Sequence, residues 1–338
     1  MEYGAIDLHL RHSLIRIVSA TGDVVLERRI LTSRATLTEV FGARPPMQVL
    51  LETGTESEWV AQAVEACGHA VVVADPNYAV MYGARTRRIK TDRRDVAALA
   101  EACRLGVFRP AHRVSADQRQ RRREVRVREQ LIRTRTQLIN LLRAQLRQDG
   151  YRLPAGSAET AVRRYRRLDL PTGLAEALAP VIRLLDALAP ALADADAAIQ
   201  AAAAADPIVR RLMTVPGIGP VTAVTFRAIL DDVDRFADAN AVTAFLGLVP
   251  REQSSGEHQR KGRITKAGPR TLRALLVNAA WCVWRQRRGR AALHAWVEQL
   301  AARRGRRIAV VALARRLARI LYALWRNEED YRPVPLAA

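Results

Sequence analysis

The sequence predicts an α/β domain at the N-terminal end, followed by a chain made mostly of α-helices. Short apolar or alternating segments separated by turn residues fill residues 3–75, a pattern typical of strands interleaved with helices. From about residue 115 the apolar residues recur at helical spacing instead. The 338 residues are enough for two or three domains, since domains usually hold ~100–200 residues.

Residues 3–31 predict three antiparallel strands. YGAIDLHL is a short apolar run, SLIRIVSA alternates between apolar and polar residues, and VVLERRI follows a turn at residues 21–23. Ser33 is a suitable N-cap for a helix over about 34–42.

Two more strands with helices between them complete this domain. Residues 47–53 (MQVLLET) form a fourth, buried strand, residues 57–67 a helix, and residues 69–75 (HAVVVAD) a fifth strand. An Arg-rich stretch, GARTRRIK, precedes a helix that begins near Thr91. By analogy, this order of elements is that of the ribonuclease-H-like fold.

Two long helices, over about 115–149 and 172–205, are predicted to form a coiled-coil-like stalk. The apolar stripe of the first consists of Leu131, Leu138, Leu141 and Leu142. The arginines crowding its start are Arg121, Arg122, Arg123, Arg126 and Arg128. The residues at seven-residue steps in the second are Leu178, Leu185, Leu192 and Ile199. Pro180 and Pro190 are expected to kink or divide the second helix. The helices would pack side by side, either within one chain or between chains.

The last third of the chain is predicted to be helical with short loops. The segment VPGIGPVTA resembles a helix-hairpin-helix turn, in which Gly217 and Gly219 would expose backbone N–H groups to a phosphate. A corner between helices with no ligand is the alternative. The tryptophans Trp281, Trp284, Trp296 and Trp325 recur at helical spacing, which favours a place in the core over stacking on bases. The predicted domains are 1–112 (α/β), 113–205 (stalk) and 206–332 (mostly helical).

Charge points to a polyanionic partner. Lys and Arg number 55 against 34 Asp and Glu, a formal net charge of +21. Such an excess repels itself unless a polyanion screens it, so nucleic acid is the expected partner. Three scattered cysteines give neither a disulfide framework nor a zinc pattern and fit a reducing cytoplasm. No uncharged stretch reaches the ~20 apolar residues that span a bilayer.

Four carboxylates are predicted to meet in the first domain. Asp7 lies near the end of the first strand and Glu52 ends the fourth, and these strands are neighbours in a ribonuclease-H-like sheet. With Thr91 as N-cap, Asp92 and Asp95 share one face of the first helical turn. Taken alone, these two acids would only complement the helix dipole. Four converging acids instead predict two Mg²⁺ ions, ~3.5–4 Å apart, which support in-line phosphoryl transfer.

Several segments resemble one insertion-sequence transposase family, numbered one hundred and ten and related to the Piv and MooV DNA invertases. In the first domain these segments are AIDLH (5–9), LLETGTESEW (50–59), VADPNY (73–78) and KTDRRDVAALAEACRLG (90–106). Towards the C-terminus they are LMTVPGIGPVTA (212–223), FLGLVPREQSSGEHQRKGRITKAGPRTLRALLVNAA (245–280) and RIAVVALARRLARILYALW (307–325). The resemblance covers nearly the whole chain in the same order.

The resemblance implies a RuvC-like first domain with a DEDD tetrad at Asp7, Glu52, Asp92 and Asp95. It also implies a serine in the second domain, at Ser255, that attacks a DNA phosphate and forms a phosphoserine link; the neighbouring Ser254 is the alternative. Family members act as oligomers, here a dimer or tetramer, whose active sites combine domains of different subunits. Some are guided by a structured bridge RNA that pairs with donor and target DNA.

Read from its residues alone, Ser254-Ser255-Gly256 is a polar loop, and such a loop is more often a turn than a nucleophile. Basic residues that would hold phosphate follow it, namely Arg260, Lys261, Arg263, Lys266, Arg270 and Arg273. A second basic set near the acids is Arg85, Arg87, Arg88 and Lys90. No histidine is singled out as a base, and Glu56 and Glu58 are expected on the surface.

The leading hypothesis is therefore a Mg²⁺-dependent, serine-assisted DNA transposase in the prokaryotic cytoplasm, at the nucleoid. A RuvC-like structure-specific endonuclease without a covalent intermediate is the second hypothesis. A non-catalytic nucleic-acid-binding protein is the third, but it gives no reason for four converging acids.

Overall fold

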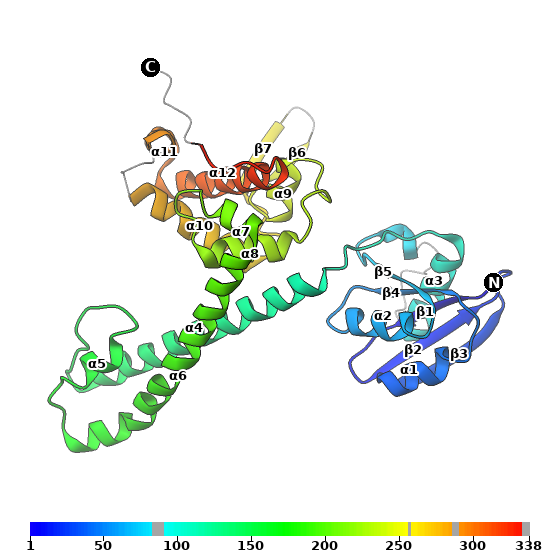
Figure 1. Ribbon diagram of the computed structural model, residues 1–338, viewed down its shortest axis with the longest axis horizontal. Helices are drawn as coiled ribbons and strands as arrows, with labels where there is room; N and C mark the ends of the chain where they lie inside the picture. The colour runs from blue at the N-terminus through cyan, green and yellow to red at the C-terminus, as the bar shows by residue number, and fades with distance from the viewer. Residues whose placement is uncertain (83–90, 256–257, 286–290, 333–338) are drawn as a thin grey trace. The chain divides into compact units, whose positions relative to one another are not determined.

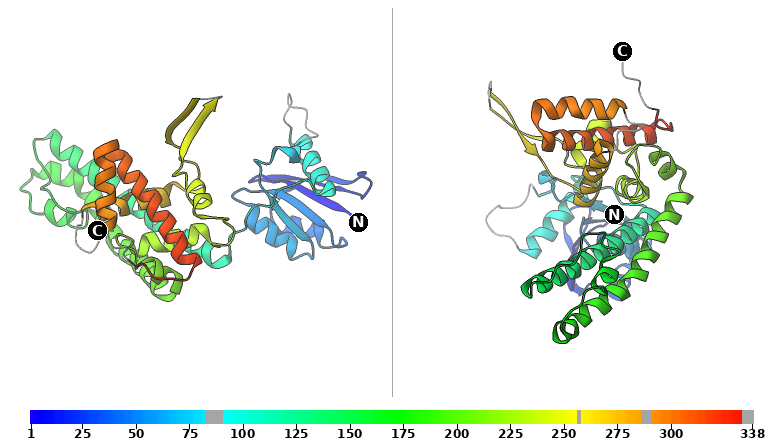
Figure 2. Two further views of the ribbon diagram at one scale, coloured as in Figure 1. Left: turned by 90° about the horizontal axis from the view of Figure 1, so that it is seen from above. Right: turned by 90° about the vertical axis from the view of Figure 1, so that its left-hand side faces the viewer.

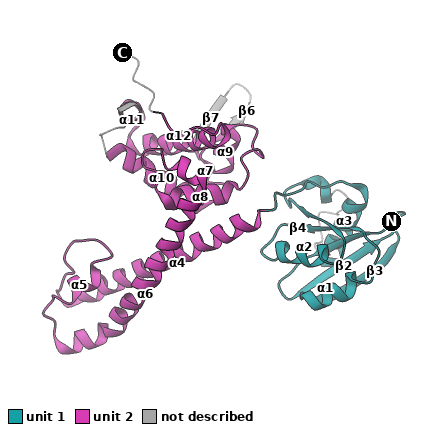
Figure 3. Ribbon diagram, viewed as in Figure 1, with its two compact units in different colours: residues 1–113 teal, residues 114–338 magenta. Residues whose placement is uncertain are grey.

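The computed structural model describes residues 1–82, 91–255, 258–285 and 291–332, except for the side chains of 253–255, 258–261 and 291–292 (Figure 1). The chain divides into two compact units, residues 1–113 and 114–338 (Figure 3). No helix among the described residues is long and apolar enough to cross a membrane.

A five-stranded sheet is the centre of the first unit. Its strands are β1 (Tyr3–Asp7), β2 (His12–Val18), β3 (Val24–Leu31), β4 (Gln48–Glu52) and β5 (Ala70–Ala74), in the order β3-β2-β1-β4-β5. The first three strands are antiparallel, and β1, β4 and β5 run parallel to one another. This confirms the predicted meander and places the first and fourth strands side by side.

Helices cover both faces of this sheet. α1 (Arg34–Phe41) and α2 (Ser57–Glu65) share one hydrophobic cluster with Ile6 and Leu51, whereas α3 (Asp92–Leu105) shares another with Ala5 and Leu50 (Figure 2). Successive residues of a strand point to opposite faces. Every second residue of β1 and β4 therefore faces α3. A short 3₁₀ turn, η1 (Ala79–Tyr82), follows β5.

Both predicted helix caps of this unit are confirmed. Ser33 Oγ accepts a hydrogen bond from the backbone N–H of Thr36 at 3.3 Å. Thr91 Oγ1 accepts one from Arg94 at 3.4 Å. Each cap satisfies one of the backbone donors that the first turn of a helix leaves without a partner.

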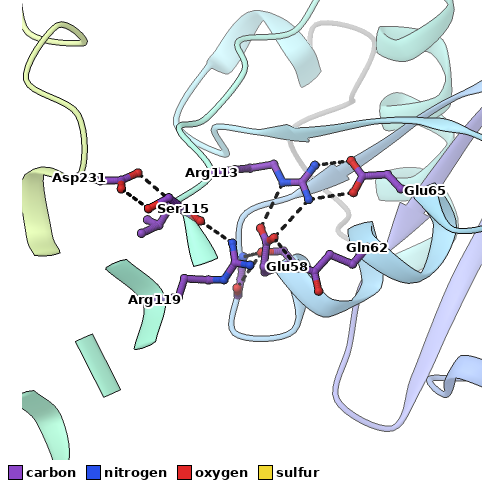
Figure 4. Close-up of polar contacts among 10 residues, drawn as sticks. Glu58, Gln62, Glu65, Arg113, Ser115, Arg119 and Asp231 are labelled. Atoms are coloured by element: carbon purple, nitrogen blue, oxygen red, sulfur yellow. Dashed lines mark hydrogen bonds and ion pairs between the residues drawn. The ribbon is translucent and has the colours of Figure 1, made fainter. Parts of the chain in front are cut away.

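The last segment of unit 1 is bound back onto the sheet and α2. The backbone N–H of Asp75 donates to the carbonyl of Arg109, and that of Ala111 donates to Val73, both at 2.8 Å. The guanidinium of Arg113 then contacts the carboxylates of Glu58 and Glu65 on α2 (Figure 4). Arg113 thus fixes the end of unit 1.

Unit 2 begins with two long helices, α4 (Ala116–Gln148) and α6 (Thr172–Ala205), which lie side by side (Figures 1 and 2). The short α5 (Ala161–Tyr165) packs near their far end. The apolar seam joins Ile139, Leu142 and Leu146 of α4 to Leu178, Ile182 and Leu185 of α6. The pairing, left open by the sequence, is therefore within one chain.

In the predicted stalk, the place of Leu141 is wrong, and of the two outcomes expected at the prolines, division of the second helix does not occur. Leu141 was placed in the apolar stripe, but 45% of it is exposed and Leu142 takes the buried place. Pro180 and Pro190 do not divide α6, which runs through both. Both prolines lie on the exposed side of the helix, where water can satisfy the carbonyls that lose their N–H partners.

The remaining helices form a bundle around one hydrophobic core. They are α7 (Pro207–Leu212), α8 (Pro220–Leu230), α9 (Ala239–Phe245), α10 (Arg270–Arg285), α11 (Ala291–Arg304) and α12 (Arg306–Arg326). Trp284 and Trp325 are buried in this core, and Trp281 and Trp296 pack against it. The expectation that the tryptophans are structural is confirmed.

A β-hairpin replaces the polar loop that the sequence predicted after residue 249. β6 (Pro250–Ser255) pairs antiparallel with β7 (His258–Ile264). The segment is almost entirely polar, so it has no apolar alternation by which a strand is recognised. Pairing between the two strands satisfies the backbone instead.

Candidate active site

The first two acids of the predicted site end neighbouring strands. Asp7 is the last residue of β1 and Glu52 the last of β4, and Ile6 and Leu51 directly before them are register partners. Ala5 and Leu50 belong to the cluster beneath α3. Because side chains alternate along a strand, Asp7 and Glu52 are directed to that same face.

The other two acids come from the first turn of α3, which covers that face. Thr91 caps the helix and fixes where it begins. Asp92 is 66% exposed, whereas Asp95, three residues later, is only 7% exposed. The capped first turn therefore holds Asp92 at the surface and Asp95 buried beneath it.

Two of these acids and a nearby histidine lie within reach of a single ion. Atoms of Asp7, His9 and Asp92 that could act as ligands all lie within 4.8 Å of one another. His9 Nε2 is 3.4 Å from Asp7 Oδ2 and 3.8 Å from Asp92 Oδ1. The imidazole thus contacts two carboxylates from different elements.

The charge balance around Asp7 is unfavourable for a carboxylate. Burial raises its pKa above 3.8, the neighbouring His9 lowers it, and the negative charges of Asp92 and Asp95 raise it further. Its Oδ2 atom is buried and makes no hydrogen bond to the described residues. Repelling acids around such an oxygen suit a divalent cation, because carboxylate oxygens are the ligands that Mg²⁺ prefers.

A cavity of about 430 Å³ opens beside these acids, lined by residues 7–10 and 52–56. Glu52 lies on this cavity together with Asp7 and His9. Glu56, expected on the surface, also lines it, and its carboxylate accepts a hydrogen bond from Trp59 Nε1. Glu58, likewise expected on the surface, is instead half-buried against Arg113.

His9 was missed by sequence reasoning. It stands two residues after Asp7, within the quoted AIDLH segment, but a histidine just past a strand has no spacing that marks it as a ligand. Only the start of α3, folded over the strand end, brings Asp92 to its other side.

The predicted nucleophile stands at the tip of the hairpin. Ser255 is the last residue of β6 and pairs with His258, and Ser254 pairs with Gln259. Gly256 lies outside the described residues, and the side chains of both serines, Arg260 and Lys261 are also outside that description. Arg85, Arg87, Arg88 and Lys90 lie outside the described residues as well.

The remaining predicted phosphate contacts lie on and after the hairpin. Arg263 is exposed on β7, Lys266 is exposed in the turn after it, and Arg270 is the first residue of α10. Arg273 instead donates hydrogen bonds to the carbonyls of Leu246 and Ala267 within unit 2.

The two glycines of the predicted helix-hairpin-helix turn have different backbone conformations. Gly217 has φ +83°, and a Cβ there would lie 2.8 Å from Val283 Cγ2 and 2.9 Å from the Ala279 carbonyl oxygen. Gly219 has the ordinary φ of −96° and is the N-cap residue of α8. Gly217 is therefore required for close packing against α10, a reason that the sequence did not suggest.

Comparison with known proteins gives a consistent assignment over the whole chain. Residues 5–149 match a DEDD transposase family named after IS110, and residues 209–295 match the transposase IS116/IS110/IS902 family. The first range contains the four acids and the second contains Ser255.

Several whole proteins are also similar. A probable family 20 transposase of Pseudomonas aeruginosa is 32% identical, over 98% of this chain and all of its own length. A putative transposase of Sinorhizobium fredii, y4pF/y4sB, is 30% identical over 93% of this chain and 81% of its own. The transposase for insertion sequence element IS1111A of Coxiella burnetii is 30% identical over 92% and 86%.

Proposed function

The chain belongs to the IS110 family of transposases and is a DNA recombinase, and from that premise we propose that it cuts and rejoins DNA strands to move an insertion sequence. The observation that carries this proposal is the meeting of Asp7 and Asp92, from a strand end and a helix start, around His9. We assign unit 1 a ribonuclease-H-like, RuvC-like role from its strand order.

The proposed metal ligands are Asp7, Glu52, Asp92 and Asp95, holding two Mg²⁺ ions. When bound, the ions supply positive charge to the attacking and leaving oxygens of a phosphoryl transfer. Asp7 and Glu52 are held by the sheet and the two aspartates by the capped turn of α3, so the ligands are positioned before DNA arrives.

The proposed nucleophile is Ser255. Its hydroxyl gives up a proton as a bond forms between Oγ and a DNA phosphorus; the bond from that phosphorus to a sugar oxygen breaks, and that oxygen takes up a proton and leaves as the hydroxyl end of a strand. Attack by a hydroxyl of another strand on the same phosphorus then frees the serine and joins the strands. The cations around the hairpin, including Arg260, Lys261 and Arg263, would hold the phosphates.

The proposed functional segments are the catalytic domain (1–112), the stalk (113–205) and the serine domain (206–332). A transposase implies DNA as a partner. We further propose that the protein works as a dimer or tetramer, that a structured bridge RNA directs it, and that the Arg85–Lys90 stretch and the Gly217–Gly219 turn contact nucleic acid. The strongly basic composition supports binding of polyanions.

A mutant series tests the two halves of the site separately. Strand transfer is measured with a plasmid carrying the insertion element, and covalent adducts are resolved on denaturing gels after proteolysis. Asp7→Asn and Glu52→Gln should each abolish the strand-transfer product and the covalent protein–DNA adduct. DNA binding in EDTA should persist.

Ser255→Ala should abolish the adduct and strand transfer, and Ser254→Ala is its matched control. Full strand transfer by Ser255→Ala, with loss in Ser254→Ala, would move the nucleophile by one residue. Free cut ends without any adduct in the unaltered protein would instead favour a structure-specific endonuclease.

A further inference from the structure

A second cavity is lined by residues of unit 2 alone. It has a volume of about 280 Å³ and is bounded by α4, α8, α9 and the start of α10. Its cations are Arg122 and Arg126 from α4 and Arg270 from α10. Three positive charges around one hollow need an explanation, because like charges repel.

Arg122 is a fixed part of the wall. Its Nε and Nη2 atoms donate hydrogen bonds to the carbonyls of Ala228 and Ile229, each 2.8 Å long. These carbonyls belong to the last turn of α8, where helix carbonyls lack intrahelical partners. Burial lowers the pKa of Arg122, and the positive charge of Arg126 lowers it further.

Arg126 and Arg270 are exposed, and within the described part of the chain neither makes a hydrogen bond or ion pair. The carboxylate lining the cavity, Glu129, already accepts a hydrogen bond from Thr271 at 2.8 Å and pairs with Arg133. The lining therefore presents three arginines against one engaged glutamate. The charged side chains that remain unengaged, Arg126 and Arg270, are positive, so the cavity can bind an anion.

Apolar side chains from α4, α8 and α9 complete the lining. Phe245 and Ile229 are partly buried there, and Val125 is buried beside them. An aromatic ring next to guanidinium groups is the combination that binds an unpaired base and its phosphate. At about 280 Å³ the hollow is just below the ~300–1,000 Å³ of pockets for drug-sized ligands, so it suits one nucleotide and not a duplex.

We propose that this cavity binds a single unpaired nucleotide of a DNA or RNA strand, its phosphate between Arg126 and Arg270 and its base against Phe245 and Ile229. The proposal rests on the proposed function only in taking nucleic acid as the ligand. It assigns unit 2 a single-strand contact separate from the acids and from Ser255.

Binding is tested with the full chain in EDTA, so that no catalysis intervenes. The probes are fluorescein-labelled single-stranded DNA and RNA of one sequence, the same DNA as a duplex, and an all-abasic strand of equal length. Arg126→Gln and Arg270→Gln should each weaken single-strand binding about tenfold, the loss of one charged hydrogen-bonded contact. Arg123→Gln, an exposed charge on α4 outside the cavity, should weaken it less than about threefold.

The base is tested by Phe245→Leu, which keeps an apolar side chain of similar size. It should weaken binding of the single strands several-fold and leave the abasic strand unaffected, with circular dichroism confirming that the variant is folded. The stronger of the DNA and RNA probes identifies the source of the strand.

Equal losses for Arg126→Gln and Arg123→Gln would overturn the proposal, because they would indicate only general attraction. The proposal is also overturned if Arg126→Gln weakens binding of the duplex as much as binding of the single strand, or if Phe245→Leu weakens binding of the abasic strand as much as binding of the single strand. Because all four probes are bound in EDTA, failure here is distinguishable from failure of the proposed catalysis, which is measured as strand transfer with a divalent metal present.

Discussion

Replacing Arg113 should loosen the end of unit 1. Its guanidinium reaches Glu58 through Nε at 3.1 Å and Nη2 at 3.2 Å, and Glu65 through Nη2 at 3.0 Å and through Nη1 (Figure 4). These contacts raise the pKa of Arg113 above its ordinary value. They also keep two carboxylates of one helix together, which would otherwise repel.

The size of the effect follows from burial. Hydrogen bonds to charged groups contribute ~1.5–3 kcal/mol when buried, whereas exposed ion pairs contribute ~0–1 kcal/mol. The three side chains are 26–36% exposed, between those limits. We therefore expect Arg113→Gln to lower the free energy of unfolding of unit 1 by about 1–1.5 kcal/mol. Glu65→Gln should restore part of this in the double variant, because it removes the repulsion.

The assay is hydrogen exchange of peptides from β1, β4 and α2, followed through a urea series, which reports on unit 1 separately from unit 2. Arg28→Gln is the matched control, since the Arg28–Glu39 pair is about half exposed on both sides and should cost less than ~0.5 kcal/mol. If Arg113→Gln costs no more than this control, or if its effect and that of Glu65→Gln simply add, the reasoning fails.

Three further outcomes are expected. Gly217→Ala should destabilise unit 2 by ~2–4 kcal/mol in urea denaturation, because of its positive φ and its contacts with α10; Gly173→Ala on α6, with open space around it, should be neutral or stabilising. In EDTA, unit 1 should lose stability as pH rises from about 4 through the raised pKa of Asp7, because the folded state holds the proton of the Asp7 carboxyl group more tightly than the unfolded state does. Asp7→Asn should remove this loss of stability. A pH profile of stability that is the same in Asp7→Asn and the unaltered chain would contradict the prediction. Cys282 is exposed and should react with iodoacetamide, whereas Cys103, buried with its pKa raised to about 12, should stay unmodified until unfolding, as peptide mass spectrometry would report.

Much of unit 1 was predictable because its signals are local. The end of β4 at Glu52 follows from an apolar run, and the start of α3 follows from Thr91 as a cap. Adjacency of β1 and β4 followed from the order of elements by analogy, and the register of Ile6 with Leu51 bears it out. The end of β4 and the start of α3 are each set by residues within a few positions of one another, whereas the adjacency of β1 and β4 rested on the analogy.

Features that depend on distant segments were not predictable. The hairpin around Ser255 has no apolar face, so nothing in its sequence distinguishes it from a polar loop. Gly217 is needed because α10 approaches it from more than sixty residues away. The apolar stripes of α4 and α6 are equally compatible with pairing within one chain and with pairing between chains. Only the structure shows that the two helices pair within one chain.

The sequence by itself determined where the four acids stand on their elements: Asp7 and Glu52 at strand ends, Asp92 and Asp95 in a capped first turn. Tertiary structure alone decided which side chains meet. It joined His9 to Asp7 and Asp92, raised the pKa of Asp7, and brought Glu56 onto the same cavity. The physical reason is that hydrogen bonding and periodicity fix each element locally, whereas distances between charges depend on how α3 packs across the ends of β1 and β4.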